Sequence, residues 1–342
     1  MKTILVTGGA GYIGSHTLRA LTEHGFRALC LDNLSTGFHG FVGNVPLIEG
    51  DLADRDHIDR AFSAHTIDAV IHFASHALVE ESCRNPHKYY RDNIQNCLNL
   101  LEAMRKHGVA PVVFSSSCSV YGIPEALPIR ETTPLNPVNP YGFTKMVVER
   151  ILRDYEKAYG LRSVSLRYFN AAGAASDGTI GEWHDPETHL IPRLFQVAVG
   201  KAPAAEIYGR DYPTRDGTCI RDYIHVTDLA EAHVAALEYM FSGGISDVFN
   251  LGTGKGCSVL DVTRQVESTA GKELPVSWQP RRAGDPPELV ADPTKARAVL
   301  GWEAPHSSLE VIVDSAWKWH CANHDQLLPP QPGNVPPDRK SK

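Results

Sequence analysis

Tyr141 and Lys145 form a Y-x-x-x-K motif, a spacing that can support proton transfer. In a helix, residues four apart lie on the same face, one turn from each other. An ammonium group beside a phenol favours the phenolate and lowers the tyrosine pKa from about 10 toward neutrality. The pair can therefore act as a general base on a substrate hydroxyl group. The competing interpretation is two unrelated surface residues, because so short a motif recurs by chance.

Three consecutive serines, Ser115, Ser116 and Ser117, end an apolar run that we predict to be a strand. Ligands bind beyond the carboxyl ends of strands in open parallel sheets, so a hydroxyl group there can contact the same substrate oxygen as Tyr141. The alternative is that these serines are ordinary turn residues. Their position favours the catalytic interpretation of the Tyr/Lys pair.

A glycine-rich segment, residues 8–14 (GGAGYIG), follows the first apolar run and precedes a helical pattern. In a dinucleotide-binding turn, Gly8 permits the tight bend, Gly11 lets the backbone approach a pyrophosphate and Gly14 lets the helix pack closely on the strand. The helix N-terminus supplies unpaired N–H groups and the positive end of its dipole to the phosphates. The segment therefore predicts a dinucleotide site.

Asp32 ends the second predicted strand, where a carboxylate accepts a hydrogen bond from a ribose 2′-hydroxyl and repels a 2′-phosphate. The predicted cofactor is accordingly NAD and not NADP. A simple strand-end cap is the alternative role for Asp32. Asp51 ends the third predicted strand and can receive the adenine amino group, although a turn aspartate fits its spacing equally well.

Short β-branched runs alternate with helical stretches through the first half of the chain. Near-continuous apolar strands suit a parallel sheet covered on both faces, and the alternation implies right-handed crossovers. We therefore predict an α/β fold with a doubly wound Rossmann parallel sheet. The predicted strands are 3–7, 28–32, 46–49, 68–74, 112–116 and 163–168, and the predicted helices are 13–24, 55–64, 88–106 and 141–159.

The composition and the hydrophobic periodicity of the chain change after Asn170. Residues 171–217 are rich in Gly, Pro, Asp and Thr and show only short periodic pieces. We expect an NAD-binding domain at 1–170, a smaller α/β substrate lobe at 171–325 with chain returning to the first domain near 225–255, and a flexible tail at 326–342. Helices are predicted at 226–241, 258–270, 293–300 and 309–321, and strands at 206–208, 248–251 and 275–279.

The composition excludes several classes of protein. The chain has 342 residues, and 33 Lys+Arg against 40 Asp+Glu give a net charge of −7. This diffuse negative balance argues against non-specific binding to nucleic acid or anionic membranes. No apolar run approaches a membrane span, and the seven cysteines show no metal-like spacing. We expect a cytoplasmic protein with reduced thiols, no bound metal, no nucleic acid and no membrane contact.

Longer motifs give the chain a family resemblance from about residue 2 to 320. It resembles the extended short-chain dehydrogenase/reductase superfamily and, within it, the UDP-glucose/UDP-galactose 4-epimerases. The motifs that carry the resemblance are VTGGAGYIGSH at 6–16, LDNLS at 31–35, IHFA at 71–74, FSSS at 114–117, NPYGFTK at 139–145, LRYFNAAGA at 166–174, DGTCIRDYIHV at 216–226 and NLGTG at 250–254.

The resemblance implies roles for individual residues. It makes Tyr141 the catalytic base, Lys145 the residue that binds the nicotinamide ribose, and Ser117 the bridge to the sugar 4-hydroxyl. Cofactor contacts are implied for Gly8, Gly11, Tyr12, Ile13, Gly14, Asp32, Asn33, Asp51, Leu52, Phe73, Ala74, Asn93, Ser115, Tyr141, Lys145 and Tyr168. Substrate contacts are implied for Ser117, Ser119, Tyr141, Asn170, Leu190, Tyr208, Arg221, Arg282 and Asp285, with Tyr208 stacked on uracil.

The implied activity is the interconversion of UDP-glucose and UDP-galactose in a homodimeric enzyme. NAD removes hydride at carbon 4, the 4-keto sugar rotates, and the hydride returns to the opposite face of the sugar. Three alternatives stay open. Leu289 occupies the position associated with pocket size, so a 4-epimerase of UDP-N-acetylglucosamine or UDP-xylose also fits. A nucleotide-sugar 4,6-dehydratase would carry an Asp-Glu pair where this chain has Cys118 and Ser119. A non-catalytic NAD-sensing protein would usually lack the Tyr/Lys pair.

Two residues depart from the usual pattern of the resembling family. Ala77 stands where many members have a lysine that reaches the cofactor phosphates, and Asp92 stands where asparagine is more usual. Both departures bear on cofactor contacts. Neither affects the groups that carry the proton or hydride chemistry.

Overall fold

Seven parallel strands form the central sheet, in the order β10-β6-β5-β4-β1-β2-β3. The computed structural model describes residues 1–282 and 284–323. The chain fills one half of the sheet with β1 to β3 and then crosses back to β4, so a topological switch point lies between β1 and β4. The strands are β1 (Thr3–Thr7), β2 (Arg27–Asp32), β3 (Leu47–Glu49), β4 (Ala69–His72), β5 (Pro111–Ser117), β6 (Arg162–Tyr168) and β10 (Asp247–Leu251). The predicted doubly wound α/β fold is confirmed.

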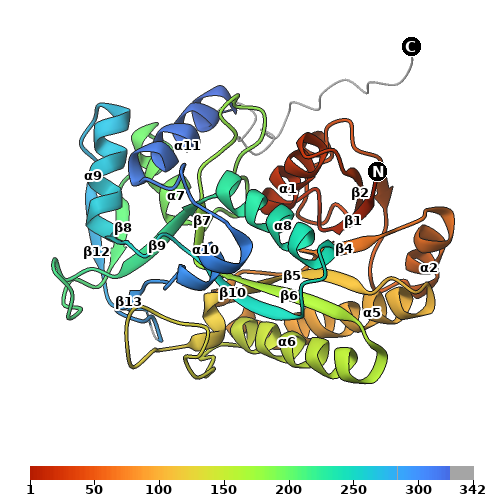
Figure 1. Cartoon of the computed structure of the whole chain (residues 1–342). Helices are drawn as coiled ribbons and strands as arrows, with labels where there is room; N and C mark the ends of the chain where they lie inside the picture. Colours follow the sequence, from red (N-terminus) through yellow and green to blue (C-terminus); the bar gives the residue numbers. More distant parts are fainter. Residues whose placement is uncertain (283, 324–342) are drawn as a thin grey trace, which may run out of the picture.

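The two faces of the sheet bury separate apolar clusters. In β1, Ile4 and Val6 belong to the cluster beneath α1 and α8, whereas Leu5 belongs to the cluster beneath α2, α5 and α6. This division follows from the alternation of side chains between the faces of a strand. Figure 1 shows the two helical layers on opposite sides of the sheet. These helices are α1 (Tyr12–Glu23), α2 (Arg55–Ala64), α5 (Asn96–Lys106), α6 (Pro140–Tyr159) and α8 (Val226–Phe241).

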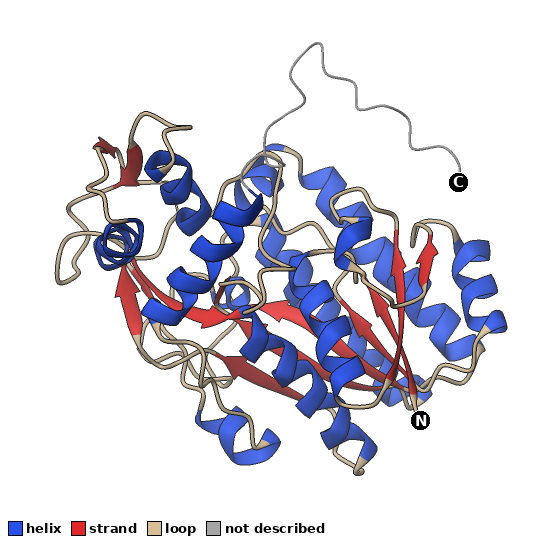
Figure 2. Cartoon of the chain, turned by 90° about the horizontal axis from the view of Figure 1, so that it is seen from above, coloured by secondary structure: helices blue, strands red, loops and turns tan. Residues whose placement is uncertain are grey.

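A second region of helices and short strands lies at one end of the central sheet (Figures 1 and 2). Three of its helices share one apolar cluster, to which they contribute Leu194, Val266 and Val313. Short strands form a four-stranded sheet, with β11-β9-β13 and β7 beside β9, and a separate β12-β8 pair. The elements are β7 (Asn170–Ala172), α7 (Leu190–Ala198), β8 (Ala205–Tyr208), β9 (Ile220–His225), β11 (Gly256–Ser258), α9 (Val259–Ala270), β12 (Val276–Gln279), β13 (Glu288–Leu289), α10 (Thr294–Leu300) and α11 (Leu309–Asn323).

Two predictions of secondary structure need correction. The helix predicted at 88–106 is interrupted: α3 (Val79–Arg84) and α4 (Pro86–Tyr89) lead into a π-helical turn η2 (Tyr90–Gln95), and only then does α5 begin. The stretch 171–217, predicted to be irregular, contains α7, whose apolar face packs into the second cluster. Its Gly- and Pro-rich flanks concealed the periodicity.

Strand β9 was absent from the predictions because its sequence, IRDYIH, carries a charged pair in the middle. Asp222 is nevertheless fully buried. Its carboxylate accepts hydrogen bonds from the backbone N–H groups of Thr253, Gly254 and Ala291, at 2.8, 3.0 and 3.1 Å. A buried carboxylate with this many donors is tolerated, so an element with a polar centre can lie in the core.

The expected flexible tail at 326–342 lies outside the described residues. Among the described helices, none has the length and apolar character that a membrane span requires. All seven cysteines are free thiols.

Candidate active site

The turn between β1 and α1 leaves backbone donors open to a ligand. Gly8 has a φ of 73°, a conformation that favours glycine. A Cβ at Gly14 would lie 2.2 Å from the Gly8 carbonyl oxygen, so the helix packs against the turn only because residue 14 has no side chain. At the helix start, Gly11 provides no side-chain cap and the first turn carries no acidic residue. Such an N-terminus fits the pyrophosphate of a dinucleotide.

Asp32 lies beside this turn, at the carboxyl end of β2. Its side chain is 8% exposed and accepts hydrogen bonds from the N–H groups of Ala10 at 2.9 Å and Leu34 at 2.8 Å. Burial raises the pKa of Asp32, while these two hydrogen bonds lower it. Next to it, the Asn33 amide donates to Asp51 at 2.8 Å. The residues expected at the adenosine end of the cofactor are therefore together at one edge of the sheet.

Replacing Asp32 by asparagine is expected to weaken NAD binding about tenfold or more. The change removes a charged acceptor, and hydrogen bonds to charged groups contribute about 1.5–3 kcal/mol. It also removes the repulsion of a 2′-phosphate, so the preference for NAD over NADP should fall. Calorimetric titration of Asp32→Asn with both dinucleotides measures the two effects, and an unchanged NAD affinity would contradict the assignment.

Tyr141 lies in the first turn of α6, and the N-cap of the helix fixes its position. The Asn139 side chain accepts a hydrogen bond from the Gly142 N–H at 2.8 Å. Tyr141 is 8% exposed and Ser117 is 7% exposed, and interaction with the Ser117 side chain lowers the pKa of Tyr141. Ser117 also accepts from the Ser119 N–H at 3.2 Å, capping the short helix η3 (Cys118–Tyr121). The strand-end hydroxyl of Ser117 and the Tyr141 phenol therefore lie close enough to interact.

Lys145 is buried one turn further along α6 and connects three elements. Its Nζ donates to the Ser115 carbonyl oxygen at 2.7 Å and to Ser75 Oγ at 2.8 Å. The same Nζ lies 5.8 Å from the centre of the Tyr141 ring. The ammonium is therefore held between the ends of β4 and β5, close to the phenol.

The acid–base properties of the pair differ from the sequence-based expectation. Burial raises the pKa of Tyr141 to about 12, and the hydrogen bond with Ser117 lowers it only in part. Burial also lowers the pKa of Lys145 to about 7. The expected lowering of the tyrosine pKa toward neutrality is thus not produced by the protein groups alone, because desolvation acts against both charged forms.

The cofactor-side residues after β4 are organised by Asn93, which lies in the π-helical turn. Its amide donates to the His76 carbonyl oxygen at 3.0 Å and to Thr144 Oγ1 at 3.1 Å, and its Oδ1 accepts from the His76 N–H at 2.8 Å. π-helical turns are frequent at functional sites. Asn93 therefore fixes the loop that carries Phe73 and Ser75, and Asp92 contacts the His76 ring at 3.0 Å.

Tyr168 ends β6 opposite Ser117 in the sheet, and its hydroxyl is bonded to Ser115. Tyr12 donates its hydroxyl to the Gly173 carbonyl oxygen at 2.6 Å, so its side chain contacts the chain after β7. Leu52 is buried, and its carbonyl oxygen accepts from Asn99 at 2.9 Å. These contacts anchor the segments that carry Tyr168, Tyr12 and Leu52.

The residues expected to bind a UDP-sugar form two contacting pairs. Arg221 is ion-paired with Asp285, and the Arg282 guanidinium lies 4.0 Å from the centre of the Tyr208 ring. Arg221 also acts electrostatically on Cys118, the residue next to Ser117. Leu289 belongs to the apolar cluster that contains Cys118. Asn170 begins β7, opposite Tyr223 of β9, and Leu190 begins α7.

Two functional features escaped the sequence reasoning. The first is Ser75, whose hydroxyl accepts a hydrogen bond from Lys145. Its position just after the IHFA motif is the sequence signal that could have identified it. The second is a buried network below β5. Glu149 accepts from Ser116 Oγ at 2.6 Å and from Arg167 Nε at 2.8 Å, and Arg167 donates to Tyr121 at 2.8 Å.

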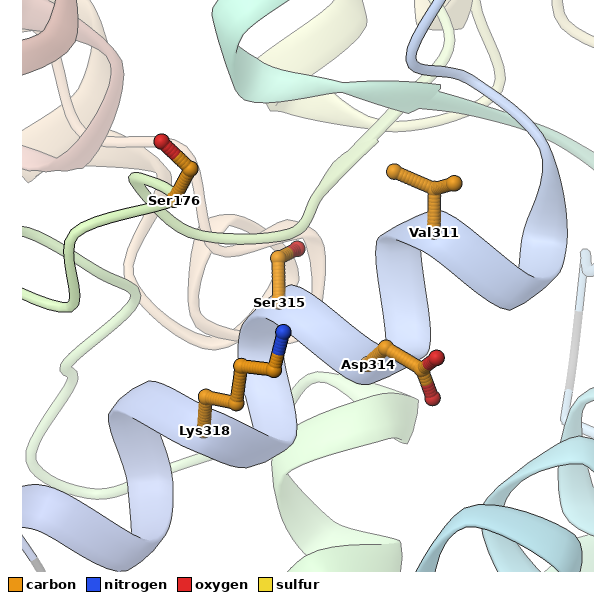
Figure 3. A pocket seen from close by; sticks show the side chains of 5 residues that line it. All are labelled: Ser176, Val311, Asp314, Ser315 and Lys318. Atoms are coloured by element: carbon orange, nitrogen blue, oxygen red, sulfur yellow. The ribbon is translucent and has the colours of Figure 1, made fainter.

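Two cavities among the described residues lie away from Tyr141. One, of about 210 Å³, is lined by Ser176 and by Val311, Asp314, Ser315 and Lys318 of α11. Figure 3 shows these side chains along one helix beside the Ser176 loop. The other, of about 440 Å³, includes Tyr223 and Arg297. Neither is lined by the Tyr/Lys pair, so the catalytic assignment rests on the side-chain contacts above.

Comparison with known proteins gives the same picture over nearly the whole chain. Residues 4–252 match the model of the NAD dependent epimerase/dehydratase family. A UDP-glucose 4-epimerase of Halalkalibacterium halodurans is 49% identical over 317 residues, 93% of this chain and 95% of the relative. The structure of UDP-glucose 4-epimerase from Brucella ovis in complex with NAD is 48% identical with a TM-score of 0.91, covering 93% of this chain and 98% of that one. The enzyme from Bifidobacterium longum, in complex with NAD+ and UDP, is 40% identical with a TM-score of 0.90, covering 95% and 99%. This chain therefore belongs to the NAD dependent epimerase/dehydratase family.

Proposed function

We propose that this chain interconverts UDP-glucose and UDP-galactose with NAD as its cofactor. The observation that carries the proposal is the pairing of Tyr141 with Ser117 at the end of β5, with Lys145 held beneath them. The open N-terminus of α1 and the Asp32 carboxylate fit the cofactor at the same edge of the sheet. Relatives with this activity at 49% identity and 93% coverage support it.

The protein side of the reaction is proton transfer and positioning. When bound, NAD supplies hydride acceptance and return at carbon 4 and a positive charge next to the phenol. Tyr141 takes the proton of the sugar 4-hydroxyl as the base and gives it back at the end. Ser117 holds the same oxygen. The positive charge of the Lys145 ammonium group favours the phenolate form of Tyr141. Burial of all three side chains excludes water from the proton path.

The diphosphate of the substrate requires local cations in a chain of net charge −7. Arg221 and Arg282 are proposed to supply them, because a guanidinium matches phosphate oxygens in two-pronged geometry. Tyr208 offers an aromatic face for uracil, with Arg282 at 4.0 Å from its ring. We also propose residues 1–170 as the cofactor domain and 171–325 as the sugar lobe, with the chain returning to the first domain near 225–255. Helix α8 and strand β10 contribute to the first apolar cluster, in agreement with this division.

A homodimer and a cytoplasmic location complete the proposal. Exposed aromatic side chains on neighbouring helices, Tyr90 at 41% and Phe143 at 42% exposure, contact each other and offer an apolar face for a second copy. Sedimentation of the purified chain tests the dimer. The seven cysteines form no disulfide with one another, as is usual in a reducing compartment.

The dehydratase alternative is not favoured by the groups around Ser117. Elimination of water across carbons 5 and 6 needs an additional acid and base. The two positions after Ser117 carry Cys118 and Ser119, and burial raises the pKa of Cys118 to about 12. A product assay distinguishes the reactions: we expect purified chain with UDP-galactose to form UDP-glucose. Accumulation of a 4-keto-6-deoxy sugar, or no product at all, would contradict the proposal.

The size of the sugar pocket is testable at Leu289. Its side chain is 9% exposed and packs in the cluster with Cys118 and Phe169. Leu289→Tyr is expected to lower kcat/KM for UDP-N-acetylgalactosamine about tenfold more than for UDP-galactose, because added bulk in a pocket costs about 1–3 kcal/mol. The exposed Leu127, changed to tyrosine, is the control. Equal effects on both sugars would show that Leu289 does not line the sugar pocket.

A further inference from the structure

Four potential metal ligands lie together in the segment before α7, in the pattern E-x-H-x-x-E-x-H. They are Glu182, His184, Glu187 and His189, and one ligand atom from each lies within 4.8 Å of all the others. No bound metal was expected from the sequence, because the cysteines show no metal-like spacing. These four residues lie in the stretch 171–217, where the sequence shows only short periodic pieces.

The two imidazoles direct the same ring nitrogen toward the same two carboxylates. His189 Nδ1 lies 3.0 Å from Glu182 and 3.0 Å from Glu187. His184 Nδ1 lies 3.7 Å from Glu182 and 3.4 Å from Glu187. The two ring centres are 4.6 Å apart. Four donor atoms of two kinds therefore converge on one point between them.

The carboxylates at this point are buried, although the segment is a loop. Glu182 is 8% exposed and the Glu187 side chain is 7% exposed. Two buried carboxylates side by side are costly without a compensating cation. A cation at the convergence point would neutralise both.

The orientation of Glu187 is fixed by the backbone around it. Its Oε1 accepts the N–H groups of Thr188 and His189, both at 2.8 Å. Hydrogen-bonded ligands of this kind are held in place before an ion arrives, as the outer partners of metal sites do. The other carboxylate oxygen of Glu187, Oε2, lies 3.4 Å from His184 Nδ1.

We propose that Glu182, His184, Glu187 and His189 bind one divalent transition-metal ion, with Zn²⁺ as the ion that best fits the set. Two imidazole nitrogens and two carboxylate oxygens are ligands that Zn²⁺ takes in tetrahedral geometry, at about 2.0–2.2 Å. Ligand atoms at those lengths are about 3.4 Å apart, so the described cluster closes by small side-chain movements. Mg²⁺ and Ca²⁺ prefer all-oxygen sites and fit this one less well.

The metal would fasten the loop to both regions of the molecule. His184 packs edge-on against Tyr12, the first residue of α1, with ring centres 6.5 Å apart. His189 immediately precedes α7 as its N-cap residue. Trp183, between two ligands, stacks on Phe38 at 4.6 Å. The site therefore serves as a structural clamp beside the dinucleotide turn, and the argument for it does not depend on the proposed epimerase activity.

The test is metal binding by the untagged, full-length protein. Chain stripped with a chelator is titrated with Zn²⁺, and the number of ions bound per chain is measured by elemental analysis. Reloading with Co²⁺ should give the visible absorption of a tetrahedral ion. We expect one Zn²⁺ per chain and a rise in Tm with added Zn²⁺, because a ligand that binds the folded form stabilises it.

Ligand variants separate a metal site from a simple ion-pair cluster. His184→Gln and Glu187→Gln should each bind Zn²⁺ at least about tenfold more weakly and lose the Co²⁺ spectrum. His24→Gln is the matched control, because His24 contacts Glu231 at 2.9 Å on the surface without belonging to the cluster. The proposal is overturned if the wild-type chain takes up no stoichiometric Zn²⁺, a result that needs no variant to fold. It is also overturned if both ligand variants bind as tightly as the wild type.

Discussion

Changing Tyr141 to phenylalanine is expected to lower kcat by about 10²–10⁴-fold, the usual contribution of a positioned general base. The variant keeps the ring, which is 8% exposed and packed in the first turn of α6. It removes the hydroxyl that pairs with Ser117 and takes the substrate proton. Steady-state conversion of UDP-galactose measures the loss, and bound NAD is measured by absorbance after denaturation.

The matched control for this variant is Tyr155→Phe on the same helix. The Tyr155 hydroxyl donates a partly buried hydrogen bond to Glu102 at 2.7 Å, near the other end of α6 from Tyr141. We expect this variant to retain wild-type kcat. Full activity in Tyr141→Phe would show that another group is the base. A loss of NAD together with activity would instead point to a role of the hydroxyl in cofactor binding.

Glu149→Gln is expected to destabilise the protein by about 3–5 kcal/mol, the cost of leaving one partner of a buried ion pair uncompensated. The Arg167 and Glu149 side chains are 5% and 3% exposed, and Glu149 also accepts from Ser116. Urea unfolding monitored by tryptophan fluorescence measures the change. Because Ser116 lies between Ser115 and Ser117, kcat should also fall.

A surface ion pair on the same helix is the control for Glu149. Arg150 contacts Asp154 at 3.0 Å, with side chains 70% and 53% exposed. Asp154→Asn should change stability by less than about 1 kcal/mol, because exposed pairs contribute little. Equal effects of the two substitutions would mean that the buried Glu149–Arg167 pair contributes no more to stability than an exposed pair.

Much of the cofactor half could be predicted from local sequence. Gly8 and Gly14 occupy a turn whose geometry excludes side chains, and Asp32 ends a strand of a parallel sheet, so residue type and position are closely linked. Tyr141 and Lys145 follow an Asn-Pro helix start that fixes their orientation. Each of these signals lies within one strand–turn–helix unit, which is why the pattern alone identified them.

The rest depends on contacts between distant segments. The link from Lys145 to Ser75 spans 70 residues, and the one from Arg167 to Tyr121 spans 46. The burial that raises the Tyr141 pKa arises from the assembled site and not from neighbours in sequence. The cluster at Glu182 is local in sequence, but only the fold of its loop shows that its four side chains converge.

The most direct test of the central claim follows the hydrogen at carbon 4. UDP-galactose deuterated at carbon 4 is incubated with the purified chain, and the product is analysed by NMR and mass spectrometry. The account predicts UDP-glucose that retains deuterium at carbon 4, because the same enzyme molecule removes and returns that hydrogen within a closed site. UDP-glucose with solvent hydrogen at carbon 4, deuterium moved to carbon 6, or no UDP-glucose at all would contradict it.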